Sequence, residues 1–259
     1  LKDVLNYTAP NIIVVQEMIN QAGVNLFLNG VLNNNYSAAP FVNGYDTDNA
    51  LFYKHSKVNF NNLEQIGTTL RDISAYNLTI KNNTIIIYSL HLKASTGSTN
   101  ELKRYNEILQ LKNHIDNLPE NQHYIIAGDF NIYKASESAY NLLMTLTYDP
   151  INRPGNWNNN FAFRDIHTQS TRITNFGGGA TGGLDDRFDQ ILLSDEFNSY
   201  PGYKFVDGSY QAFGNDANHF NLAINSGTNL VVPQYLANSL HSASDHLPVI
   251  AKFNYIVSN

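Results

Sequence analysis

The chain has 259 residues, of which 42% are hydrophobic and 15% charged, and its formal net charge is −6. This length and apolar content suit one large domain or two small ones with a buried core, and the low charge content excludes disorder caused by charge excess. The lack of cysteine excludes disulfides, thiolate zinc sites and a cysteine nucleophile, while the acidic balance argues against non-specific binding to nucleic acid, which rests on Lys and Arg.

Apolar β-branched runs recur along the whole chain, and no linker or charge block separates them. We therefore predict a single domain over residues 1–259. After a helix end at 2–7, the runs typical of buried strands are 12–15, 85–90, 124–127, 188–193 and 247–253. Alternating residues predict half-exposed strands over 63–70 and 73–80, and Asn82-Asn83 marks a tight turn after the second.

One long helix is predicted between Ser98 and Pro119, with a capping box formed by Ser98 and Glu101. Its charged residues Lys103, Arg104 and Lys112 are assigned to the solvated face. A shorter helix is expected over 136–146, and the Asn- and Gly-rich stretches 152–160 and 177–183 are expected to be long surface loops. Many strands with few helices between them favour an α+β domain of two packed sheets with helices outside.

Polar side chains cluster at the ends of the predicted buried strands. Glu17, His91 and Asp129 each follow a strand, whereas Asp189, Asp245 and His246 stand at the start of one. If the first three strands run toward one edge of the sheets and the last two run away from it, all six side chains meet there. Clustered carboxylates repel unless a cation neutralises them, and oxygen ligands select a hard ion such as Mg²⁺. The pattern suits metal-assisted attack of water on phosphorus, with an imidazole moving the proton.

Other reaction classes lack their motifs. No GxSxG elbow, no P-loop and no HExxH occur. The glycines at 177–183 precede a strand, so we interpret them as a mobile loop that borders the cleft. Arg71 and Arg187 are interpreted as residues that steer an anionic substrate. Trp157 is either a stacking platform or a partly buried loop anchor.

Five short motifs are arranged in order along the chain. They are Gln16-Glu17, Ser89-Leu90-His91-Leu92, Gly128-Asp129-Phe130-Asn131, Phe188-Asp189-Gln190-Ile191 and Ser244-Asp245-His246. This series resembles the endonuclease/exonuclease/phosphatase superfamily, which contains pancreatic deoxyribonuclease, abasic-site endonucleases, bacterial sphingomyelinases and inositol-phosphate phosphatases. The resemblance covers nearly the whole chain. It implies a four-layer α/β sandwich of two packed, mostly antiparallel β-sheets with helices on the outer faces.

The resemblance also implies roles for the motif residues. Glu17 would ligate the metal and Asp245 would support the metal shell. His246 would act as general base on the attacking water or as a donor to the phosphate, with Asp189 orienting its ring. Asp129 and Asn131 would hold the water and a phosphate oxygen, and His91 would donate to the phosphate or leaving group. Asp72 matches the acid that partners this last residue in some members.

The chain departs from the family pattern at its start. Members begin with a strand bearing an Asn of the metal and phosphate site, whereas Leu1 is only sixteen residues before Glu17. We therefore expect the first strand to lie upstream of Leu1.

Together these features predict a Mg²⁺-dependent phosphodiesterase, with Mn²⁺ or Ca²⁺ as alternative ions, that acts as a nuclease on transiently bound DNA or RNA. A phospholipid phosphodiesterase of the sphingomyelinase type, a small-molecule or inositol phosphatase, and an inactive binding member are the alternatives. We expect a monomer without a transmembrane segment, since no apolar run approaches the ~20 residues of a membrane span. Abundant Asn and absent Cys fit a secreted bacterial protein.

Overall fold

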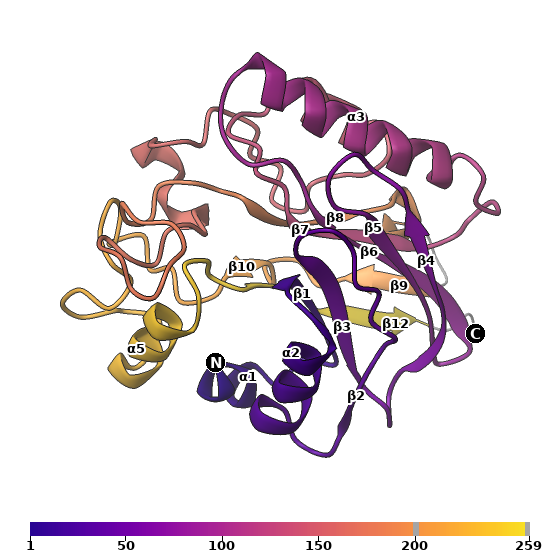
Figure 1. Cartoon of the computed structure of the whole chain (residues 1–259), viewed down its shortest axis with the longest axis horizontal. Coiled ribbons are helices and arrows are strands. Elements are labelled where there is room, and N and C mark those ends of the chain that lie inside the picture. The colour runs from indigo at the N-terminus through magenta and orange to yellow at the C-terminus, as the bar shows by residue number, and fades with distance from the viewer. Residues whose placement is uncertain (199–201, 257–259) are drawn as a thin grey trace.

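A five-stranded sheet lies at the centre of the structure (Figure 1), a computed structural model that describes residues 1–198 and 202–256. Its strand order is β4-β5-β6-β7-β8, and every neighbouring pair is antiparallel except β6 with β7. The strands are β4 (Asn59–Ile66), β5 (Ile73–Ile80), β6 (Asn83–His91), β7 (Tyr124–Asp129) and β8 (Asp189–Leu193). The parallel pair needs a crossover, which helix α3 (Ser98–Ile115) supplies.

A three-stranded sheet forms a second layer against one face of this sheet. Strands β1 (Ile12–Met18), β3 (Asp48–Lys54) and β2 (Tyr36–Ala38) pair in the order β1-β3-β2. Strand side chains alternate between two faces, so Ile12 and Val14 pack with the five-stranded sheet while Ile13 and Val15 face away from it.

Helices cover both outer faces, which completes the predicted four layers. Helices α3 and α4 (Ser138–Leu143) pack on the far face of the five-stranded sheet. Helix α2 (Gln21–Leu26) and the turn η1 (Phe27–Val31) cover the outer face of β1 and β3. The remaining elements are α1 (Lys2–Thr8), η2 (Phe161–Ile166), η3 (Asp195–Asn198), β9 (Gly202–Phe205), β10 (Gln211–Ala212), α5 (Gln234–Ala243), β11 (Val249–Ile250) and β12 (Phe253–Ile256). Among the described residues, none of the helices combines the length and the apolar character needed to cross a bilayer.

The long helix was predicted with the wrong cap, and one of its residues, Arg104, was assigned to the wrong face. Gly97 is the N-cap and no side chain caps the helix, so Ser98 and Glu101 form no capping box. Arg104 is fully buried, not solvated, because Glu137 accepts from its guanidinium at 2.8 Å and the carbonyls of Lys93 and Ser95 accept from it as well. A buried arginine is tolerable only with such partners.

The last predicted strand is broken in two. Its first half, β11, pairs with β10, and its second half, β12, pairs with β9. Between them the backbone N–H of Lys252 donates to the hydroxyl of Ser209 at 3.0 Å instead of continuing one ladder. The strand predicted over 63–70 also ends early, at Ile66.

Candidate active site

Three of the predicted side chains lie in one row across neighbouring strands. The register of the five-stranded sheet pairs His91 with Asp129 and Asp129 with Asp189. Directly paired residues point to the same face of a sheet, so the predicted meeting of strand ends is correct for these three. Gly128 allows the close pairing, because a Cβ on it would lie 2.0 Å from the carbonyl oxygen of Leu90 and its φ is +142°.

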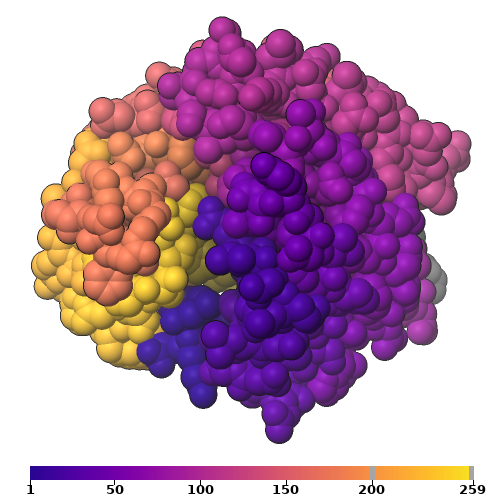
Figure 2. Space-filling view, in the orientation of Figure 1, coloured from indigo at the N-terminus to yellow at the C-terminus, as the bar shows by residue number. Residues whose placement is uncertain are grey.

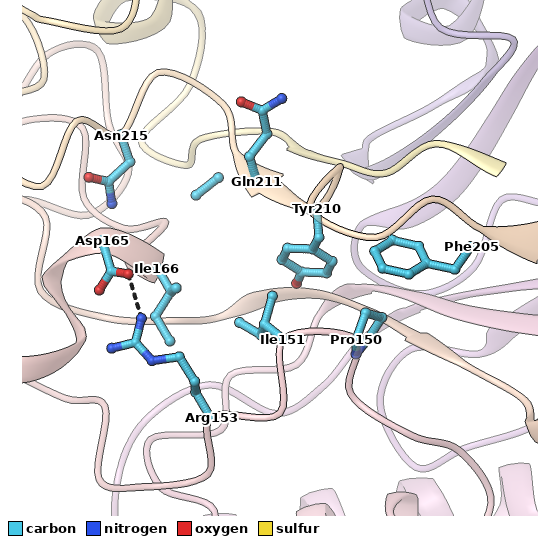
Figure 3. Close-up of a pocket in the computed structure, with 11 residues that line it drawn as sticks. Pro150, Ile151, Arg153, Asp165, Ile166, Phe205, Tyr210, Gln211 and Asn215 are labelled. Atoms are coloured by element: carbon cyan, nitrogen blue, oxygen red, sulfur yellow. Dashed lines mark hydrogen bonds and ion pairs between the residues drawn. The ribbon is translucent and has the colours of Figure 1, made fainter.

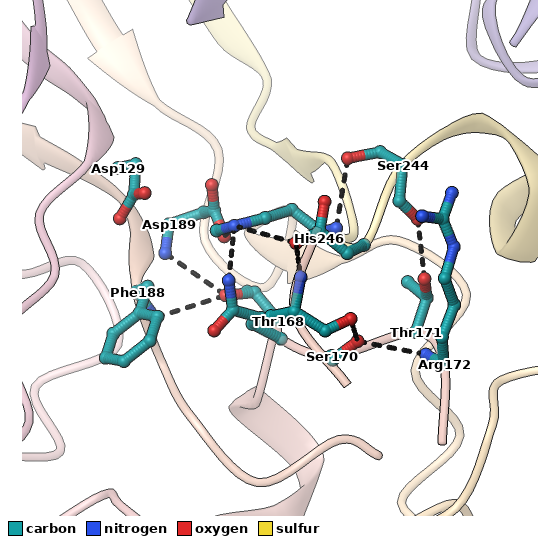
Figure 4. A network of polar contacts seen from close by, with 12 residues as sticks. Asp129, Thr168, Ser170, Thr171, Arg172, Phe188, Asp189, Ser244 and His246 are labelled. Atoms are coloured by element: carbon teal, nitrogen blue, oxygen red, sulfur yellow. Dashed lines mark hydrogen bonds and ion pairs between the residues drawn. The ribbon is translucent and has the colours of Figure 1, made fainter. Parts of the chain in front are cut away.

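His246 joins the row from the segment that precedes β11. Its Nδ1 lies 2.7 Å from Oδ2 of Asp189, and its Nε2 lies 4.0 Å from Oδ2 of Asp245 (Figure 4). Both partners are less than one-fifth exposed. Burial alone would lower the pKa of His246, but the carboxylates of Asp189, Asp129 and Asp245 together raise it to about 10. Asp189 is thus in hydrogen-bond contact with the ring nitrogen that the resemblance assigned to it.

Asp129 is held by its neighbours in the Gly-Asp-Phe-Asn motif. The side-chain amide of Asn131 donates to Oδ2 of Asp129 at 2.9 Å, and the backbone N–H of Asn131 donates to Oδ1 at 3.0 Å. Burial raises the pKa of Asp129 to about 7, although the nearby His246 lowers it. Burial therefore favours the protonated form of this carboxyl group more than it would be favoured in water.

His91 contacts Asp129 across the row, with 3.4 Å between Nε2 and Oδ2. The imidazole is 7% exposed, and burial together with the charges of Arg71 and His246 lowers its pKa to about 4. These influences favour the neutral form of the His91 imidazole.

Glu17 lies at an irregularity in β1. The β1–β3 register shifts between Val15 and Met18, and Glu17 has a φ of +65° and an exposed side chain. The amide of Gln16 donates to the hydroxyl of Ser89 at 3.0 Å, which fastens the end of β1 to β6. The charge of Glu17 reaches the row, since it contributes to the raised pKa of Asp129. Bulges commonly re-aim a side chain beside an active site.

Asp245 is covered by the glycine-rich loop. The backbone N–H of Ala180 donates to Oδ2 of Asp245 at 2.6 Å. A Cβ on Gly179 would lie 2.7 Å from the carboxyl carbon of Asp245, so this close approach requires glycine. The loop thus contacts a predicted site residue, in keeping with its predicted place at the cleft.

Of the predicted substrate-binding residues, Arg71 is near the site. Its charge lowers the pKa of His91, and its Nη2 pairs with Asp46 at 2.9 Å. Asp72 does not serve as the partner of His91: its carboxylate accepts from the N–H of Thr68 in a turn, and the carboxylate in contact with His91 is that of Asp129.

Arg187 was predicted wrongly as a substrate-steering residue. It is 1% exposed and forms a bidentate pair with Asp149, at 2.8 and 3.0 Å. Its guanidinium also lies over the ring of Trp157, 5.1 Å from the centroid. Trp157 is itself fully buried, so it is a loop anchor and not a stacking platform.

Sequence reasoning missed two residues that shape the site. The Thr168 hydroxyl accepts from the backbone N–H groups of Phe188 and Asp189, both at 3.1 Å (Figure 4). The side-chain amide of Gln169 reaches Nε2 of His246. Thr168 and Gln169 precede the glycine-rich loop, in a stretch without strand periodicity. Their importance is apparent only from their contacts with residues far away in the sequence.

The donors present fit a hydrated hard cation better than a closed metal cage. Over residues 1–198 and 202–256, no three Asp, Glu or His side chains gather so as to hold a metal by themselves. Mg²⁺ commonly binds through one or two carboxylates and keeps several waters. Several carboxylates act on one imidazole here, and such an excess of negative charge favours a neutralising cation.

The described surface is hollowed at more than one place. In Figure 2 the surface is recessed between the indigo N-terminal atoms and the orange and yellow atoms of the C-terminal third. A separate pocket of about 360 Å³ is bordered by Phe205, Tyr210 and the ion pair of Arg153 with Asp165 (Figure 3). None of the residues predicted for catalysis lines this second pocket.

The family of the chain follows from comparison with known proteins. Residues 1–246 match the Endonuclease/Exonuclease/phosphatase family. The chain belongs to this family. Phosphate-ester hydrolysis is therefore its expected reaction class. Among the curated proteins, none matches the sequence.

Solved structures with the same fold include proteins with different names and bound molecules. TDP2 of D. rerio, complexed with a single-strand DNA product, has a TM-score of 0.64 at 17% identity, over 97% of this chain and 89% of that one. The mannosyl-6-phosphatase of Bacteroides thetaiotaomicron gives 0.59 at 14% identity, over 98% and 89%. The human nocturnin catalytic domain with bound sulfate gives 0.55 at 17%, over 98% and 83%. At these identities the likeness shows a shared fold and no particular substrate.

Proposed function

We propose that this family member is a divalent-metal-dependent phosphodiesterase that acts as a nuclease on DNA or RNA. The observation that supports it most directly is the His246–Asp189 pair, 2.7 Å apart, at the end of the row formed with Asp129 and His91. A carboxylate on Nδ1 positions the imidazole so that Nε2 is the nitrogen that moves a proton.

The side chains divide the reaction among themselves. As a water oxygen bonds to phosphorus and the bond from phosphorus to the leaving oxygen breaks, Nε2 of His246 takes the water proton. Asp129 fixes the water through its buried carboxylate, which Asn131 orients. Neutral His91 donates a hydrogen bond to the phosphate or the leaving oxygen.

Glu17 and Asp245 would hold the cation. A bound divalent ion would offset the charge of the phosphate and of the surrounding carboxylates, so that the pKa of His246 falls toward that of a base. Without such an ion those carboxylates favour the imidazolium form.

A solved structure with the same fold favours nucleic acid over a lipid or a small phosphate ester as the substrate. TDP2 with its single-strand DNA product matches 97% of this chain. The net charge of −6 fits brief binding of nucleic acid through a local site and not through a broad basic surface. Arg71 is our candidate for binding the phosphate backbone, because its charge acts on His91.

The test is a substrate panel with and without a divalent ion. Plasmid DNA, single-stranded DNA, RNA, sphingomyelin, inositol phosphates and a sugar phosphate are incubated with Mg²⁺, Mn²⁺ or EDTA. We expect cleavage of nucleic acid that EDTA abolishes, and His246→Ala should lower kcat by about 10²- to 10⁴-fold. The exposed His55 provides the control His55→Ala, which should keep full activity. Hydrolysis of only a lipid or a phosphomonoester would refute the nuclease assignment and identify the other substrate. If no ester is hydrolysed, the protein is an inactive binding member of the family.

A further inference from the structure

The reactive nitrogen of His246 already has a protein partner. Its Nδ1 is engaged by Asp189, which leaves Nε2 as the nitrogen that faces a substrate. The side-chain amide nitrogen of Gln169 lies 2.6 Å from this Nε2. An amide both donates and accepts, so by a half turn it can pair with a ring nitrogen that lacks or bears a proton.

The backbone of Gln169 is fixed independently of this contact. Its carbonyl oxygen accepts from the N–H groups of Asp185 and Asp186, at 2.8 and 3.0 Å, and its own N–H donates to the carbonyl of Asp186. On the other side, Gln169 forms a bridge with His246. The side chain therefore starts from a defined point beside the imidazole.

The two segments are paired on both sides of that bridge. The N–H of Leu247 donates to the carbonyl of Thr168 at 2.7 Å, and the N–H of Thr171 donates to the carbonyl of Asp245 at 3.0 Å. Loss of the Gln169 side chain leaves these backbone bonds in place, so its effect on the ring is separable from folding.

We propose that Gln169 is a positioning residue that holds the imidazole of His246 from the side opposite Asp189. This inference rests on the proposed hydrolytic function. Two hydrogen bonds on opposite nitrogens remove the rotation about the ring axis that one bond would permit. The imidazole therefore meets the incoming phosphate or water in one fixed orientation.

The experiment compares Gln169→Leu and Gln169→Asn with wild-type protein. Leucine removes the polar group, and asparagine keeps an amide but is one methylene too short to reach Nε2. Gln211→Leu in β10 is the matched control, since Gln211 is exposed. Hydrolysis of bis(4-nitrophenyl) phosphate and of a single-stranded oligonucleotide gives kcat and KM, and nitrogen-15 NMR of the side chain reports Nε2 of His246.

We expect both Gln169 variants to lose about 10- to 100-fold in kcat with KM within twofold, and the Nε2 resonance to shift while Gln211→Leu changes neither. A kcat within twofold of wild type in both variants overturns the proposal, as does an unchanged Nε2 resonance. If wild-type protein hydrolyses no ester, the proposed function fails, and the resonance alone decides whether Gln169 holds the ring.

Discussion

Replacing Asp189 by asparagine tests the central pair of the site. The substitution keeps the shape of the side chain and removes the charge that lies 2.7 Å from Nδ1 of His246. The amide can still accept from Nδ1–H, so the ring keeps a neighbour but loses its strongest electrostatic partner. Since Asp189 is first among the groups that raise the pKa of His246, that pKa should fall.

The size of the effect follows from the geometry. Opposite unit charges about 4 Å apart interact by about 4 kcal/mol at an effective dielectric of about 20. Both side chains are 17–18% exposed, so some solvent screening remains, and we take about 2–4 kcal/mol. At about 1.4 kcal/mol per decade this corresponds to a loss of about 30- to 1,000-fold in kcat.

The assay is steady-state hydrolysis of a phosphodiester by Asp189→Asn, with Asp207→Asn, an exposed acid, as the control. Thermal melting confirms that both variants are folded, and NMR titration follows His246. A folded Asp189→Asn variant that keeps kcat within threefold of wild type, with an unchanged pKa of His246, would refute the assigned role of the pair.

Three further predictions concern stability. Asp149→Ala should cost about 3–5 kcal/mol in urea unfolding, because it leaves the Arg187 guanidinium, 1% exposed, without its counter-charge; loss of under 1 kcal/mol would contradict this. Gly128→Ala should cost about 3 kcal/mol from strain and overlap with Leu90, and an unchanged melting temperature would exclude that clash. Burial raises the pKa of Asp186 from 3.8 to about 7, so its stabilising contribution is complete below pH 3.8 and is lost as pH rises through 7. Asp186→Asn should remove up to about 4 kcal/mol of that pH dependence, and parallel stability curves would argue against it.

The strand ends were predictable because they depend on local patterns. Continuous apolar runs located β1, β6 and β7, and an alternating run located β5. The polar residue after each continuous run indicated which edge of the sheet the strand would reach. The row of His91, Asp129 and Asp189 then followed from strand direction alone.

The buried charges were not predictable from the same patterns. Arg104 and Arg187 read as solvated or substrate-binding residues because arginine is mostly exposed. Each is buried because it pairs with a carboxylate about 30 to 40 residues away in the sequence: Arg104 pairs with Glu137, and Arg187 pairs with Asp149. A linear pattern carries no information on such pairs, and the place of Gln169 beside His246 was hidden for the same reason.

The row across β6, β7 and β8 is a single rung of the sheet's hydrogen-bond ladder. Sliding β7 by one residue would turn Asp129 to the opposite face and leave both neighbours facing an unrelated side chain. Each pair of neighbours in the row forms only when its two strands are in the native alignment. The rate of hydrolysis therefore also reports the alignment of the strands. Molecules with intact secondary structure but a shifted strand should show no hydrolysis.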